Sequence, residues 1–95
     1  MDLELAIMPV KGGDAAGMIK AMQDEGRPAL LSCPGCRSVK VYPGVENPGT
    51  VLFMIEWDSV DAHQAAKGSE GFTRFIKAAS PFFGEGAMMQ HFRIS

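Results

Sequence analysis

The sequence predicts an α+β fold of the ferredoxin-like type: a split β-α-β arrangement in which a four-stranded antiparallel sheet carries its helices on one face. Two observations predict it. Residues 50–57, TVLFMIEW, form an apolar run that leads straight into a helix N-cap at Asp58 or Ser59, as in layered structures of strands and helices. The predicted elements also follow one another in the order β-α-β-β-α-β.

The first predicted strand covers residues 3–10, which alternate loosely and end at a Lys-Gly-Gly turn. Asp14 then caps a helix from Ala15 to about Glu25, with apolar residues at helical spacing on one face. We expect Gly26 to end this helix, and residues 29–32 are compatible with one further turn.

The second strand is predicted over residues 36–42 and the third over residues 50–57, with a Pro- and Gly-rich loop between them. The helix that follows is interrupted at Lys67-Gly68, and Ser69 looks like the N-cap of a second segment that ends at Ser80-Pro81. Residues 87–94 complete the sheet as the last strand.

Composition limits the functions that this chain can have. At 95 residues we expect one domain over residues 1–95. A net charge of −2 without a Lys or Arg run gives no basis for nucleic-acid binding. No apolar stretch approaches the roughly 20 residues of a membrane span, and the N-terminus lacks the features of a secretory signal. The location expected by default is cytoplasmic.

Helices on one face leave the other face of the sheet bare. Such an apolar surface implies a partner, and a second copy packed sheet to sheet is the simplest one. We therefore expect a homodimer with a cavity between the subunits. The apolar side chains expected on the bare face are those of Met8, Tyr42, Leu52, Met54 and Met89.

Four motifs resemble one known family. They are Pro-Gly-Cys at 34–36, Asn47-Pro48 before a strand, Ile-Glu-Trp-Asp-Ser at 55–59 and Ser-Glu-Gly-Phe at 69–72. In this order and spacing they resemble the antibiotic biosynthesis monooxygenase (ABM) family of dimeric α/β barrels. The resemblance covers nearly the whole chain and implies one ABM-like barrel domain. The resemblance implies that this chain is similar to one of three kinds of protein found in that family. These are oxygenases of quinols or polyphenols that need no cofactor, haem-degrading enzymes, and proteins without a known activity.

The sequence departs from the family at its usual helix histidine. That histidine lies nine residues after the Trp, where this chain has Ala66, and His63 stands three residues earlier. The haem-degrading members carry a Trp at the position of Ala66 and a His near Ile76, and neither is present here. Haem degradation by that arrangement is therefore not expected.

Strand alternation predicts which residues line the cavity. We expect the helices to cover one set of strand faces, which carries residues 3, 5 and 7, Val39 and Val41, Phe53 to Trp57, and Phe92 and Ile94. The opposite faces of the strands then enclose the site. That pattern describes a mostly apolar pocket with a few polar groups, as small-molecule sites have. The residues on those faces are Glu4, Ala6, Met8, Ser38, Lys40, Tyr42, Leu52, Met54, Glu56, Met89, His91 and Arg93.

His91 is the strongest candidate for a catalytic residue, since a histidine titrates near neutral pH and could take a proton from a phenol or quinol. Arg93 could hold the resulting phenolate, and Tyr42 could bond to or stack on an aromatic ring. Glu56 could orient His91, although a salt bridge with Lys40 or Arg93 is the more common role. The predicted substrate-binding residues are Met8, Lys40, Leu52, Met54, Glu56 and Met89.

Other chemistry-bearing residues have simpler interpretations. Trp57 is expected to pack in the core, and His63 to be a partly exposed helix residue. Cys33 and Cys36 precede a strand, so no helix N-terminus lowers their pKa, and two cysteines supply only two of the four ligands of a zinc site. The methionines lack a His or Cys cluster beside them, so no metal site is predicted.

Two functions remain open at this stage. The first is a monooxygenase that acts on a small aromatic quinol or polyphenol without a cofactor, in a pocket between sheet and helices or at the dimer interface. The second is a non-catalytic dimeric barrel that binds a small apolar ligand or haem. The absence of the usual helix histidine favours the second, whereas His91, Arg93 and Tyr42 favour the first.

Overall fold

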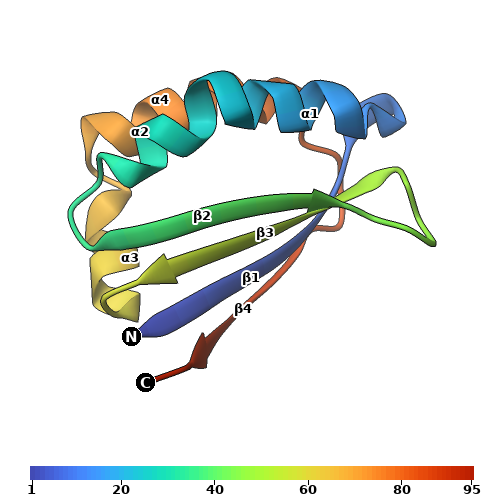
Figure 1. The fold of residues 1–95 in the computed structure, drawn as a ribbon. Helices are drawn as coiled ribbons and strands as arrows, with labels where there is room; N and C mark the ends of the chain where they lie inside the picture. The colour runs from blue at the N-terminus through green and yellow to red at the C-terminus, as the bar shows by residue number, and fades with distance from the viewer.

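The computed structural model describes residues 1–95 and contains the predicted elements in the predicted order. Figure 1 shows them as a curved sheet with helices above it. The helices are α1 (Ala15–Ala21), α2 (Arg27–Leu31), α3 (Val60–Ala66) and α4 (Glu70–Ala79), and the strands are β1 (Asp2–Pro9), β2 (Cys36–Pro43), β3 (Thr50–Trp57) and β4 (Met88–Arg93). Short turns of other helix types are η1 (Lys11–Gly13), η2 (Met22–Gly26) and η3 (Ser80–Phe82).

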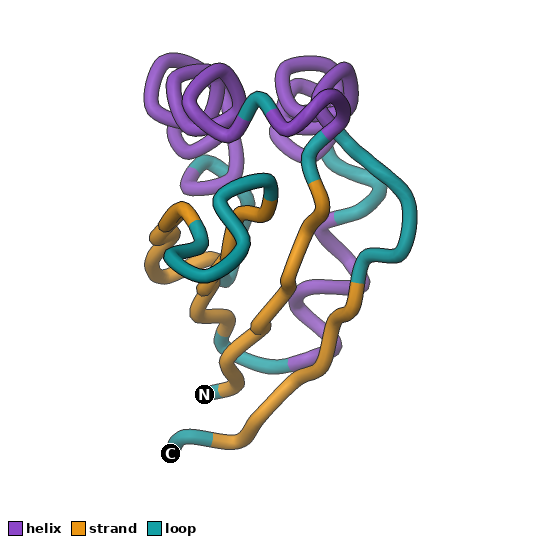
Figure 2. Tube along the Cα trace, turned by 90° about the vertical axis from the view of Figure 1, so that its right-hand side faces the viewer, coloured by secondary structure: helices purple, strands orange, loops and turns teal.

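The four strands pair antiparallel in the order β2-β3-β1-β4, which confirms the ferredoxin-like fold. The helices α1, α2 and α4 cover one face of this sheet, while α3 lies at one end of it (Figure 1). Figure 2 shows the same two layers from the side, with the opposite face of the sheet uncovered. None of the helices has the length and apolar character needed to cross a bilayer.

The first helical segment does not end at Gly26, so that prediction was wrong. Gly26 has helical φ and ψ angles of −65° and −45°, and the chain passes from α1 through the π turn η2 into α2. Pro28 is tolerated because it lies in the first turn of α2, where its missing N–H costs little. The N–H of Arg27 bonds to Met22 five residues back, as a π turn requires.

Two of the four strands face the way that we predicted. Val51, Phe53, Ile55 and Trp57 alternate as buried residues under the helices, and Val39 of β2 is buried beside them. The core that these side chains share with α1, η2 and α2 includes Met18, Met22 and Leu30, each no more than 1% exposed.

The faces of β1 and β4 are the reverse of the prediction. Glu4 pairs with Ile55 on one side and with His91 on the other, so all three point toward the helices. Ile7 is 42% exposed, whereas its neighbour Ala6 is 7% exposed. Both faces of these strands carry apolar residues, and a shift of one residue moves every side chain to the other face, so alternation alone could not decide.

The uncovered face of the sheet is apolar, but its membership differs from the prediction. Tyr42, Leu52 and Met54 lie there as expected. Met8 and Met89 do not, because they share the helix-covered face with Glu4. The remaining apolar side chains of the open face, as we call it below, are Leu3, Leu5, Ile7, Met88 and Phe92.

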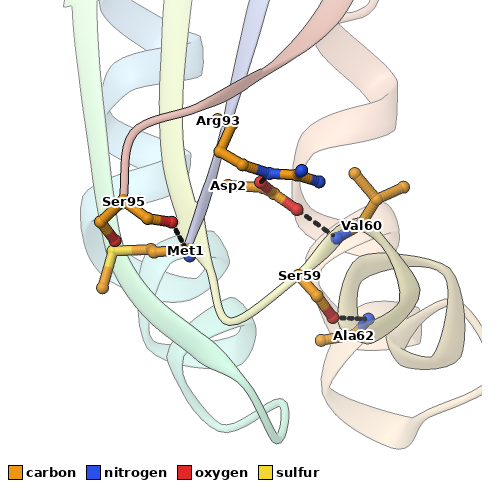
Figure 3. Close-up of polar contacts among 7 residues, drawn as sticks. All are labelled: Met1, Asp2, Ser59, Val60, Ala62, Arg93 and Ser95. Carbon is orange, nitrogen blue, oxygen red and sulfur yellow. Dashed lines mark hydrogen bonds and ion pairs between the residues drawn. The ribbon is translucent and has the colours of Figure 1, made fainter.

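Helix α3 is fixed to the sheet by polar contacts at its first turn (Figure 3). The hydroxyl of Ser59 caps the helix and accepts a hydrogen bond from the N–H of Ala62 at 3.0 Å. Asp2 of β1 accepts a second bond, from the N–H of Val60 at 2.9 Å, and its other oxygen lies 3.3 Å from Arg93 of β4. The residues of α3 are therefore held at a defined position beside β1 and β4.

Candidate functional site

Three titratable side chains from three different elements meet on the helix-covered face. The carboxylate Oε1 of Glu4 lies 3.3 Å from Nε2 of His63, and Nδ1 of His63 lies 2.8 Å from Nε2 of His91. Behind them, the indole N–H of Trp57 donates to the same oxygen of Glu4 at 3.0 Å. We call Glu4, His63 and His91 the histidine cluster.

The sheet register and the anchored helix bring the histidine cluster together. Glu4 and His91 are direct partners across β1 and β4, so they stand side by side. His63 reaches them from α3, and its ring stacks on Trp57 with 4.8 Å between ring centroids and 11° between planes. Because Trp57 is fully buried, it gives the imidazole of His63 a rigid support.

Burial decides the charge of His63. Burial, with smaller contributions from the nearby His91 and Lys67, lowers the pKa of His63 to about 4. His63 is therefore neutral at pH 7 and has one N–H and one lone pair. Burial also raises the pKa of Glu4, against the opposing effect of the Trp57 hydrogen bond.

One arrangement of protons satisfies the cluster with an ionised Glu4. His63 carries its proton on Nε2, which lies 3.3 Å from Oε1 of Glu4, and accepts at Nδ1 a hydrogen bond from Nε2 of His91. This leaves Nδ1 of His91 with an unshared electron pair. The cluster can thus hold His91 as a proton acceptor whose orientation is set by His63 and Glu4.

An apolar cavity of about 220 Å³ adjoins the cluster, and Glu4 and His63 form part of its wall. It lies between the sheet and α4, with Lys67 as its only other charged wall residue. We call it the phenylalanine cavity, because its apolar walls include Phe53, Phe72, Phe75 and Phe83, together with Met8 and Met89.

A second cavity, of about 450 Å³, lies on the other side of the molecule at the edge strand β2. Its polar wall residues are Gln23, Arg27, Lys40 and Tyr42, so it contains no carboxylate and no histidine. Although larger, it lacks an imidazole or a carboxylate that could act as a base, so the phenylalanine cavity is the better candidate for a reaction site.

Comparison with known proteins identifies the family. The sequence pattern of the family described as antibiotic biosynthesis monooxygenase, abbreviated ABM, matches residues 3–78. The chain belongs to the ABM family. A comparison with curated protein sequences gave no match.

Solved structures agree with the fold of an ABM protein. A crystal structure of a candidate antibiotic biosynthesis monooxygenase from Bordetella bronchiseptica superposes with a TM-score of 0.88 at 23% identity, covering 99% of this chain and 96% of that one. One from Caulobacter crescentus gives 0.78 at 18% identity, with 99% and 89% covered. A conserved protein from Methanosarcina mazei Go1 gives 0.77 at 18%, with 99% and 92% covered. At these levels of sequence identity, the similarity to the solved structures shows a common fold and nothing further.

This ABM protein does not place the predicted site residues in one cavity, so that prediction was wrong. His91, Arg93, Met8 and Met89 lie on the helix-covered face with Glu4 and Ala6. The other predicted residues lie across the sheet on the open face, because β2 and β3 have the predicted orientation whereas β1 and β4 have the reverse. These are Ser38, Lys40, Tyr42, Leu52, Met54 and Glu56.

The predicted partners of two charged residues also differ. Arg93 pairs with Asp2, so its guanidinium serves the anchor of α3 described above. Glu56 accepts a hydrogen bond from the hydroxyl of Ser38 at 2.6 Å and forms no salt bridge with Lys40 or Arg93. The prediction that Trp57 packs in the core is confirmed, since Trp57 is 0% exposed.

His63 is the functional candidate that sequence reasoning assigned wrongly. We expected it to be partly exposed, but it is 3% exposed and lies at the centre of the cluster. Its burial depends on how α3 docks at the end of the sheet, which no local pattern reveals. The one available signal was the pair of acidic residues, Asp2 and Glu4, on one face of a buried strand, because such groups need polar partners.

The two cysteines offer little reactivity. Burial raises the pKa of Cys36 to about 11, with Cys33 and Glu4 contributing in the same direction, so its thiol stays protonated at neutral pH. Cys33 is buried, and its sulfur lies 3.4 Å from the hydroxyl of Ser69, the N-cap of α4. Both thiols are free; Cys33 packs at the junction of α2 and α4, and Cys36, at the start of β2, packs against the core.

Proposed function

We propose that this ABM protein is a monooxygenase that needs no cofactor and acts on a small phenol or hydroquinone in the phenylalanine cavity. The observation that carries the proposal is that Glu4 and His63 form part of the wall of an apolar cavity, while His91 is hydrogen-bonded to His63. Apolar walls favour an aromatic ring, and the imidazole pair supplies a group able to accept its hydroxyl proton. Membership of the ABM family supports the same reaction class.

The volume of the cavity suggests the size of the substrate. At about 220 Å³ it is smaller than the sites of drug-sized ligands, which span roughly 300–1,000 Å³. It exceeds the roughly 150 Å³ cavity that holds benzene in an engineered protein. A single substituted aromatic ring fits between these limits.

His91 is the proposed base. It takes the hydroxyl proton of the substrate at the nitrogen that faces away from His63, and the phenolate gives up electrons to oxygen more readily than the phenol does. One oxygen atom then enters the ring, as the second carbonyl of a quinone when the substrate is a phenol and as a hydroxyl group of a quinone when it is a hydroquinone. The other oxygen atom leaves as water. The phenol supplies all four electrons, so the reaction balances without a further reductant.

We also propose that the open face is the interface of a homodimer. A patch containing Leu5, Ile7 and Phe92 on a chain of 95 residues is costly to leave in water, and a second copy would cover it. In such a dimer Lys40, Tyr42, Leu52, Met54 and Glu56 have interface roles, whereas Met8 and Met89 contact the substrate.

Oxygen uptake with a panel of phenols and hydroquinones tests the function. We expect uptake by the native protein and a loss of at least 100-fold in His91→Gln, the lower end of what a general base contributes. The control is Gln64→Ala, an exposed residue beside His63 on α3, which should retain full uptake. If the native protein binds these compounds without consuming oxygen, the non-catalytic alternative is correct. Equal rates in His91→Gln would remove His91 from the mechanism.

A further inference from the structure

We propose that the histidine cluster is a binding site for a first-row divalent transition-metal ion, held by Glu4, His63 and His91. Each of the three residues offers one ligand atom, and these atoms all lie within 4.8 Å of one another. This inference concerns binding alone and does not depend on the proposed reaction.

The chemistry of the donors selects the ion. Two imidazole nitrogens and one carboxylate oxygen suit Fe²⁺, Co²⁺, Ni²⁺ or Zn²⁺ better than Ca²⁺ or Mg²⁺, which prefer oxygen ligands alone. Two histidines and one carboxylate on one side of an ion leave its other positions open to water or another small ligand. In this chain the open side would adjoin the phenylalanine cavity, since Glu4 and His63 belong to its wall.

The spacing of the two histidines fits coordination. Their facing nitrogens are 2.8 Å apart, and two ligands at right angles around an ion, with bonds of about 2.0–2.1 Å, lie about 2.9 Å apart. Both nitrogens carry a lone pair once the shared proton moves to Nδ1 of His91, so a cation can take the place of that proton. The ligand atoms now lie within 4.8 Å of one another, whereas ligands of one ion lie about 3–4 Å apart. The carboxylate of Glu4 must therefore move by less than about 2 Å to join the two nitrogens.

Contacts around the cluster already orient the ligands, as the outer groups of metal sites do. The indole N–H of Trp57 holds Oε1 of Glu4, which leaves Oε2 available as a donor. The stacking of His63 on Trp57 fixes its ring plane.

Binding would have a consequence for the proton acceptor described above. An ion bound to Nδ1 of His63 and Nε2 of His91 replaces the hydrogen bond between these atoms. The bound metal and the shared proton therefore exclude each other. With an ion on Nε2, neutral His91 carries its proton on Nδ1, so the metal-bound form has no free electron pair there and lacks the proton acceptor.

Calorimetric titration of chelator-treated protein with Co²⁺ and with Ni²⁺ at pH 7.5 tests the site. We expect one ion per chain and an affinity at least tenfold lower in Glu4→Gln and in His91→Gln. Asp61→Asn removes an exposed carboxylate from α3 and should bind as the native protein does. His91 lies on an edge strand and is only half-buried, so its variant tests the site even if Glu4→Gln fails to fold.

The visible spectrum of the Co²⁺ complex identifies the ligands. Nitrogen and oxygen ligands give only weak bands, whereas binding by Cys33 or Cys36 would give an intense sulfur-to-cobalt band in the near ultraviolet. Any one of three results would overturn the proposal. They are that intense band, an absence of binding at 100 µM cation (about the weakest affinity of interest here), and an unchanged affinity in both variants.

Discussion

The contact between α2 and α4 depends on the absence of a side chain at Gly71. A Cβ atom there would lie 2.4 Å from the hydroxyl of Ser32, 2.6 Å from the carbonyl oxygen of Ala29 and 3.1 Å from the sulfur of Cys33. The Ser32 hydroxyl can rotate away only by giving up its hydrogen bond to Ala29. The Ala29 carbonyl is backbone, so Gly71→Ala must move α4 away from α2.

The expected cost follows from these contacts. Overpacking of this kind costs about 1–3 kcal/mol, and loss of the Ser32 hydrogen bond adds about 1 kcal/mol. Alanine returns at most about 1 kcal/mol through its better helix propensity. We therefore expect Gly71→Ala to lower the free energy of unfolding by about 1–3 kcal/mol. For a domain of this size the midpoint of thermal unfolding would fall by about 5–15 °C.

Chemical and thermal unfolding followed by circular dichroism, at one fixed protein concentration, measures this effect. Gly68→Ala is the matched control, because a Cβ there would meet only the carbonyl oxygen of Ala65 at 3.9 Å. It should leave stability unchanged or raise it by about 0.4–1 kcal/mol. If Gly71→Ala is as stable as the control, the close approach of α2 and α4 is not as described. A displaced α4 would also widen the phenylalanine cavity, which Phe72 and Phe75 line.

Three further predictions concern the helix α3, the cluster and the open face. Ser59→Ala should lower the free energy of unfolding by about 1 kcal/mol in denaturant titrations, because the N-cap of α3 is lost. A change within experimental error would show that the hydrogen bond from Val60 to Asp2 holds the start of α3 without the Ser59 cap. Burial lowers the pKa of His63 from 6.5 to about 4, so between these values the unfolded chain binds more protons than the folded one. Metal-free protein should therefore lose stability as the pH falls through that window, by up to about 3 kcal/mol, and His63→Gln should remove this loss; an equal loss in the variant would contradict the assignment. Ile7→Lys should convert a dimer into a monomer in light scattering at micromolar concentration, whereas Val45→Lys, in an exposed loop, should not; a native protein that is already monomeric would refute the interface.

Local signals in the sequence were sufficient for the order of the elements and for several of their ends. Ser69 caps α4 as predicted, and Ser59, one of the two predicted candidates, caps α3, because an N-cap depends on residues within one turn of it. The strand β3 was also assigned the correct faces, since its run from Val51 to Trp57 alternates between buried and half-buried positions.

The candidate site could not be assembled in the same way. The orientation of β1 is set by the bonds of Asp2 to α3 and of Glu4 to Trp57, and these partners are more than 50 residues away in the chain. The apolar residues Leu3, Leu5 and Ile7 suggested the opposite orientation, because they form the stronger apolar face of the strand. Once β1 is reversed, β4 follows through its register, and His91 moves from the open face to the side of His63.

Because His63 stacks on Trp57, the intrinsic fluorescence of the protein can report on the state of the histidine cluster. Trp57 is the only indole in the chain, so its fluorescence has a single source. An imidazole lying 4.8 Å from that ring influences the emission, and it does so differently when neutral, protonated or coordinated to an ion. Events at the cluster can therefore be followed in unlabelled protein, by the intensity of its own emitted light.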